Sequence, residues 1–148
     1  MSIVETISQQ TREALKAGDS ATAGVFRLMT AQFQNAAIEK REGPGATLSD
    51  DEALRVLERE AKKRREAITL YRQGNREDLA AKEEQELAII LRYLPAQLTE
   101  DEIEAIIKKS MAAGAKEFKD VMKAVSAETR GRADGAKVAA LVKAAVGQ

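Results

Sequence analysis

Residues 93–102, Tyr-Leu-Pro-Ala-Gln-Leu-Thr-Glu-Asp-Glu, mark the place where one helical region ends and another begins. Pro95 has no backbone N–H and biases the residue before it away from helical geometry, so the preceding helix should end here. Thr99 and Glu102 have the spacing of a capping box, which predicts that a new helix starts at once. We therefore expect an N-terminal helical domain over residues 1–95 and a C-terminal domain over residues 96–148.

Apolar residues recur at helical spacing along almost the whole chain. In the N-terminal region, Gly18 should follow the end of the first helix, because glycine readily takes the left-handed conformation there. Ser49 and Glu52 form another capping box at the start of a long helix. Gly74 and Asn75 should end that helix and cap the next one. Long helices joined by tight turns favour an antiparallel bundle.

The C-terminal region contains shorter apolar stripes, which together can close one small core. The fold class that we expect is therefore all-α, an antiparallel helical bundle followed by a small three-helix domain. The three helices of that domain are expected at residues 100–113, 118–128 and 135–145.

The composition removes several classes of function. The chain has 148 residues with neither cysteine nor histidine, which excludes disulfides, thiol nucleophiles, histidine-based triads and the usual zinc sites. The carboxylates Glu83, Glu84 and Glu86 lie on one helix with no opposing ligand set, so we interpret them as solvated or salt-bridged surface. We expect no cofactor, no metal site and no catalytic residue. Because no apolar run reaches the length of a membrane span, we also expect a cytoplasmic protein with no membrane partner.

The formal net charge of zero hides an uneven distribution. Residues 1–107 carry 15 basic and 20 acidic side chains, whereas residues 108–148 carry 9 basic and 4 acidic ones. This asymmetry permits an acidic partner at the C-terminal end, although an ordinary solvated surface would explain it equally well.

Arg-Gly-Arg-Ala-Asp-Gly, residues 130–135, precedes the last helix within that basic end. Arginine forks match phosphate oxygens, and glycine lets the backbone come close to a ligand. The same residues also suit a plain helix–helix joint, with Gly131 in a conformation closed to other residues and Asp134 as the N-cap. Both interpretations can hold together. The candidate nucleic-acid-binding residues are Arg130, Gly131, Arg132, Lys137, Lys123 and Lys143.

A second basic run, Lys62-Lys63-Arg64-Arg65, lies inside the third helix. Consecutive helical residues fan out around the axis, so the run wraps the helix instead of facing one way. With acidic side chains one turn away, an ion-paired face is the favoured interpretation, and nucleic-acid contact is the alternative.

Five blocks, spread in order along almost the whole chain, resemble the YqeY family. Members of that family are small bacterial relatives of the C-terminal tail of GatB, a subunit of the tRNA-dependent amidotransferase. The blocks are FQNAAIEKR (33–41), EAKKRREAITLY (60–71), GNREDL (74–79), YLPAQL (93–98) and GRADG (131–135).

The resemblance implies an all-helical fold whose tail domain recognises the tRNA body. The family's basic-Gly-Arg-Ala motif falls on residues 130–133, with Arg130 where the family often has lysine. The GatB tail tends to continue with Asn-Pro, whereas this chain has Asp134 and Gly135, as its stand-alone relatives do. The carbon–nitrogen ligase chemistry, with glutamine as amide donor, belongs to a different and larger GatB domain, so the resemblance carries no active site.

The leading hypothesis is thus a non-catalytic module that binds tRNA or a tRNA-modifying or aminoacylating enzyme. The alternative is a helical adaptor that holds a protein partner without touching RNA. An exposed apolar groove would favour the adaptor, and a basic face on the C-terminal domain would favour RNA. The oligomeric state stays open.

Overall fold

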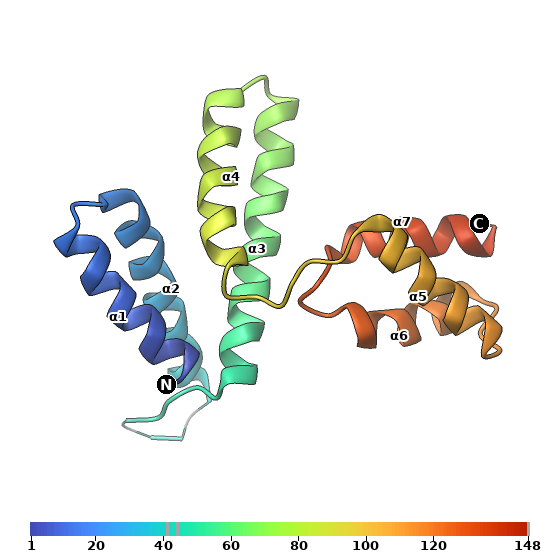
Figure 1. The fold of residues 1–148 in the computed structure, drawn as a ribbon, viewed down its shortest axis with the longest axis horizontal. Coiled ribbons are helices and arrows are strands. Elements are labelled where there is room, and N and C mark those ends of the chain that lie inside the picture. The colour runs from blue at the N-terminus through green and yellow to red at the C-terminus, as the bar shows by residue number, and fades with distance from the viewer. Residues whose placement is uncertain (41, 44, 148) are drawn as a thin grey trace. The chain divides into compact units, whose positions relative to one another are not determined.

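The computed structural model describes residues 1–40, 42–43 and 45–147, and within these ranges it contains helices and connections but no strand (Figure 1). The expected all-α fold class is confirmed. In chain order the helices are α1 Ile3–Lys16, α2 Ser20–Glu39, α3 Asp50–Gln73, α4 Glu77–Leu91, α5 Glu100–Ala112, α6 Phe118–Thr129 and α7 Gly135–Val146.

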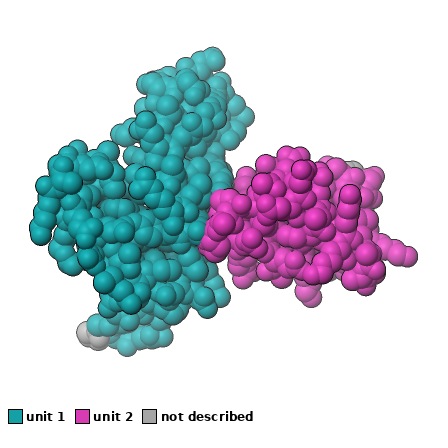
Figure 2. All heavy atoms as spheres, in the orientation of Figure 1, with its two compact units in different colours: residues 1–94 teal, residues 95–148 magenta. Residues whose placement is uncertain are grey.

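The chain divides into two compact units, coloured separately in Figure 2. Unit 1 is Met1–Leu94 and unit 2 is Pro95–Gln148. Each unit encloses its own hydrophobic core. Among the described helices, none is both long and apolar enough to cross a membrane.

Unit 1 consists of two helical hairpins, α1 with α2 and α3 with α4 (Figure 1). The hairpins lie close together where α2 passes into α3 and diverge toward the opposite end. At the close end, the backbone N–H of Ile3 donates to the Asp50 carboxylate over 2.9 Å, which joins the start of α1 to the start of α3. The predicted capping box is also present there, because the Ser49 hydroxyl accepts from the Glu52 N–H at 3.2 Å and the Glu52 carboxylate accepts from the Ser49 N–H at 2.8 Å.

The core of unit 1 draws one or more side chains from every helix of the unit. Ile7, Met29, Leu57 and Ile90 are each 1% exposed or less. Beyond the end of α4, the ring of Tyr93 packs edge-on against Phe26 with centroids 5.8 Å apart, and burial raises the pKa of its phenol. The same core cluster also contains the buried residues Val25, Phe26, Phe33, Leu48, Ala53, Val56, Ala61, Ile89 and Leu94.

A buried arginine links α3 to α4. The Arg64 side chain is only 9% exposed, and its Nη1 donates to the Glu83 carboxylate over 2.8 Å and also to the Glu86 carboxylate. Its Nε is buried and has no hydrogen-bond partner among the residues that the structure describes. Since the two glutamates lie one turn apart on α4, a single guanidinium engages both and sets the register of the hairpin.

The connection between α3 and α4 differs from the expected one. Gly74 is the C-cap itself, with φ −87°, and Asn75 takes the left-handed conformation with φ 58°. The N-cap of α4 is Arg76, whose side chain does not cap the helix and instead pairs with Asp78 at 3.1 Å. The prediction that Asn75 caps the next helix was wrong, because asparagine also tolerates the left-handed region and that use prevailed.

Unit 2 packs α5, α6 and α7 around one small core. Ile103, Ile107, Val121, Val125, Val138 and Val142 are its buried residues. The Thr99 hydroxyl accepts from the Glu102 N–H at 3.2 Å, as expected, so α5 is capped. The reciprocal half of the predicted box is replaced, because the Glu102 carboxylate accepts from the same hydroxyl at 3.2 Å.

Candidate nucleic-acid interface

Residues 130–135 form a short, ordered joint between α6 and α7. Gly131 has φ +74°, in the region that glycine occupies at least cost, and the Arg132 N–H donates to the Thr129 carbonyl over 2.9 Å. The Asp134 carboxylate accepts from the Ala136 N–H at 3.3 Å and so caps α7. The helix-joint interpretation of this motif is therefore confirmed in both of its parts.

The joint is also tied to the segment that opens unit 2. The Leu98 N–H donates to the Arg132 carbonyl over 2.7 Å, and the Gln97 side-chain amide donates to the Gly131 carbonyl over 3.1 Å. In return, the Arg132 Nε donates to the Ala96 carbonyl over 3.4 Å. These three bonds, which we call the clasp, hold together two stretches that are 34 to 36 residues apart in sequence.

The clasp separates the roles of the two arginines. Arg130 is exposed, whereas Arg132 is partly buried and uses its Nε within unit 2. Lys137, at the start of α7, pairs with Glu100 at 3.7 Å, with both side chains about half exposed. An anion at this joint would therefore meet Arg130 first, while Lys137 is already partly neutralised from the side of α5.

Helix α6 adds a row of cations to Arg130. Lys119 and Lys123 lie one turn apart, and Arg130 follows at the same angular position after the helix ends. All three are exposed, and none forms an ion pair with a described residue. The candidate set omitted Lys119, although its i,i+4 spacing from Lys123 was visible in the sequence. We call Lys119, Lys123 and Arg130 the α6 row.

Lys143 lies outside this row. It is exposed near the end of α7, six residues after Lys137, and at 100° per residue the two lysines point to different sides of that helix. The acidic first turn of α5 borders the joint through the pair between Glu100 and Lys137. Three unpaired cations of unit 2 thus share one face of α6, while the exposed Lys108, Lys109 and Lys143 lie on other helices.

The other charged clusters are largely ion-paired. In the run of residues 62–65, Arg64 is buried against α4 and Lys63 pairs with Glu60 at 3.2 Å, which supports the ion-paired interpretation for those two residues. The carboxylates of Glu83 and Glu86 are held by Arg64 and that of Glu84 by Arg72, so the salt-bridged interpretation is confirmed for all three. Across the described ranges, no cluster of acidic side chains is arranged to hold a metal ion.

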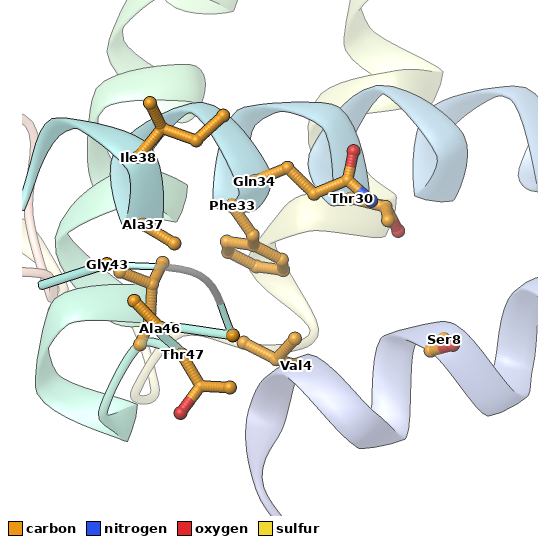
Figure 3. Close-up of a pocket in the computed structure, with 12 residues that line it drawn as sticks. Val4, Ser8, Thr30, Phe33, Gln34, Ala37, Ile38, Gly43, Ala46 and Thr47 are labelled. Atoms are coloured by element: carbon orange, nitrogen blue, oxygen red, sulfur yellow. The ribbon is translucent and has the colours of Figure 1, made fainter. Parts of the chain in front are cut away.

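Unit 1 also contains a hollow of about 540 Å³ between α1, α2 and the connection that follows α2. Its described lining carries no formal charge. Figure 3 shows the ring of Phe33 directed into the hollow, with Val4 of α1 on one side and Ala46 and Thr47 of the connection on another. Ile38 stands on its rim and is 74% exposed. A single exposed apolar side chain is ordinary on a protein surface, so the uncharged hollow, and not Ile38 alone, is the feature that could receive an apolar group.

With this geometry in hand, comparison with known proteins decides the family. The model of the family described as "Yqey-like protein" matches residues 4–146. The chain belongs to this family. Within the family match lie the joint, the clasp, the α6 row and the hollow. An uncharacterized protein of Schizosaccharomyces pombe is 30% identical over 89 residues, which cover 60% of this chain and 69% of the yeast protein.

Proposed function

We propose that this YqeY-like chain is a non-catalytic RNA-binding module that takes tRNA, or tRNA held by a modifying or aminoacylating enzyme. The observation that carries the proposal is the α6 row, three exposed cations of unit 2 with no ion-pair partner in the described chain. Unpaired arginine and lysine side chains supply the sequence-independent part of nucleic-acid affinity. Family membership supports the tRNA assignment through the resemblance to the GatB tail.

The arrangement favours contact with the RNA backbone. All three members of the α6 row are cations, and the described residues of α6 and the joint include only Phe118 as an aromatic side chain, which is partly buried in the core of unit 2. Stacking of splayed bases needs exposed rings, so phosphate and shape are the expected targets.

Titration of bulk tRNA at several salt concentrations tests this proposal. We expect the full chain to bind with a negative slope of log Kobs against log[salt]. The variant Lys119→Gln/Lys123→Gln/Arg130→Gln should make this slope shallower by about 2 to 3, at about 0.7 to 0.9 per lost phosphate contact. Arg132 is left in place because it belongs to the clasp. A matched control removes three other exposed lysines of unit 2. The control variant is Lys108→Gln/Lys109→Gln/Lys143→Gln.

The proposal fails if the parent chain shows no salt-dependent binding, or if the control weakens binding as much as the α6-row variant. Equal losses would mean that net charge alone, and no particular surface, determines affinity.

The second candidate function is a protein-binding adaptor, and the uncharged hollow of unit 1 is the observation that favours it. A partner helix could place an apolar side chain against Phe33, as helix-in-groove complexes do. Chemical crosslinking in cells followed by nuclease treatment discriminates the two functions. A crosslinked protein that persists after nuclease and is lost in Ala37→Asp would support the adaptor, whereas crosslinks to RNA that are lost in the α6-row variant would support RNA binding.

A further inference from the structure

The solvent face of α3 carries a second row of cations that the proposed function does not use. Arg55, Arg59, Lys62 and Lys63 are all exposed and fall within one quadrant-wide strip of the helix. Arg55 and Arg59 are four residues apart, about 6 Å along the helix axis. The strip is flanked along the helix by Glu52 toward the N-terminus and by acidic and polar residues toward the C-terminus.

Most of this strip is not neutralised. Lys63 pairs with Glu60 at 3.2 Å, but Arg55, Arg59 and Lys62 form no ion pair with any residue that the structure describes. Like charges at i,i+4 repel each other and slightly destabilise a helix. Arg55 and Arg59 therefore repel each other along the helix, and an external anion would relieve this repulsion.

The strip borders a polar groove between α2 and α3. Two adjoining hollows of about 260 and 270 Å³ share four lining residues, so they form one continuous groove. The side chains of Arg55 and Arg59 line it from α3, and the amides of Gln32 and Asn35 line it from α2. The residues shared by both hollows are Ala36, Glu39, Val56 and Arg59.

The acidic side chains of the groove are mostly engaged. The Glu52 carboxylate accepts from Lys40 at 3.0 Å, and the buried Glu60 carboxylate, 8% exposed, accepts from Lys63. Glu39 is the remaining carboxylate of the lining, and it has no ion-pair partner within the described ranges. The two unpaired guanidiniums thus outnumber the unpaired carboxylate, which gives the groove a net positive charge.

We propose that this α3–α2 groove and the adjoining strip form a second RNA-contact surface, located on unit 1. The surface binds phosphates of the tRNA backbone through Arg55 and Arg59 in the groove and Lys62 on the strip. The amides of Gln32 and Asn35 then face the sugars, whose hydroxyls both donate and accept hydrogen bonds. This inference rests on the proposed function in taking the same class of ligand.

An acidic protein would offer carboxylates to the same guanidiniums, but the groove suits it less well. Protein–protein contacts depend on buried aromatic or aliphatic anchors that fill an apolar pocket. The apolar part of this groove is limited to small or short side chains, Ala36 and Val56, with Leu48 at one end. A cationic, polar groove without an anchor pocket is the pattern of backbone-tracking nucleic-acid surfaces.

The test compares three variants of the full chain in tRNA titrations across salt. Arg55→Gln/Arg59→Gln should make the negative slope of log Kobs against log[salt] shallower by about 1.4 to 1.8. The control Arg12→Gln/Arg27→Gln removes two exposed cations of α1 and α2 that have no ion pair in the described chain, and it should leave the slope close to that of the parent. Glu39→Gln removes the unpaired carboxylate and should tighten binding severalfold at low salt.

The results separate this inference from the proposed function. Binding lost in the α6-row variant but unchanged in Arg55→Gln/Arg59→Gln overturns the inference alone. The reverse result supports the groove and overturns the assignment to unit 2. A parent chain without tRNA binding overturns both. A crosslinked acidic protein that is resistant to nuclease and lost in Arg55→Gln/Arg59→Gln also overturns the inference, because it assigns the groove to the other class of partner.

Discussion

Replacing Arg64 with methionine should destabilise unit 1 without touching any candidate binding surface. Methionine keeps the length of the aliphatic stem but leaves the carboxylates of Glu83 and Glu86 facing each other without a cation. Breaking a buried pair by removing one partner costs about 3 to 5 kcal/mol. Here the two glutamate side chains are 21% and 25% exposed, so water can partly rehydrate them. We therefore expect a loss of about 2 to 3 kcal/mol.

The tyrosines allow the stability of unit 1 to be measured separately from that of unit 2. Tyr71 and Tyr93 are the chain's two tyrosines, there is no tryptophan, and both tyrosines lie in unit 1. The near-UV circular dichroism of tyrosine during urea unfolding therefore reports on unit 1 selectively, and the midpoint and slope give its free energy of unfolding.

The triple variant Arg64→Met/Glu83→Gln/Glu86→Gln supplies the control. Removing the two unpaired charges should recover about 1 to 2 kcal/mol, since groups in one network are strongly coupled. The reasoning is refuted if Arg64→Met lowers stability by less than about 0.5 kcal/mol, the range of ordinary surface changes. It is also refuted if the triple variant is less stable than the single one.

Three further changes have defined outcomes. The Ser49 N–H and the Lys40 ammonium hold the pKa of the Glu52 carboxyl below its ordinary value. The contribution of Glu52 to stability is therefore complete above about pH 5 and is lost as the pH falls through the lower folded-state pKa. Glu52→Gln should weaken the fall of the urea unfolding midpoint at acid pH. Gly131→Ala should cost about 1 to 2 kcal/mol because of the positive φ, seen as faster amide exchange in α6 and α7, and unchanged exchange would contradict it. Ile38→Ser should change the tyrosine-detected stability of unit 1 by no more than about 0.5 kcal/mol, because the side chain is 74% exposed; a larger loss would show that it packs in the core.

Local chemistry explains which parts of the fold could be predicted. The Ser49 capping box and the Asp134 N-cap depend on atoms two or three residues apart, so the spacing alone was sufficient. The prediction for Asn75 was wrong because asparagine is compatible with two local conformations, and the packing of α3 on α4 determines which one it adopts.

Contacts between residues far apart in the sequence could not be predicted from local residue patterns. The burial of Arg64 could not be read from a basic run, because the partners that neutralise it come from another helix. The clasp joins residues on either side of two intervening helices, and all three of its acceptors are main-chain carbonyls, which carry no signature of residue type. Of the candidate site, Lys123 and Arg130 fall on one row, which helical spacing predicts. The separate role of Arg132 depends on its bond to the distant Ala96 carbonyl, which no local pattern indicates.

The clasp has a consequence for proteolysis at the connection between the units. Pro95, Ala96 and Gln97 are exposed and lie outside the helices, so their sequence invites cleavage. A protease needs the chain locally unfolded, however, and here opening the chain breaks hydrogen bonds to Gly131 and Arg132. The rate of cleavage near Ala96 thus measures how firmly the joint is held. A ligand that orders the joint will protect a peptide bond on the far side of α5 and α6 in the sequence, which makes limited proteolysis a sensor for binding at Arg130.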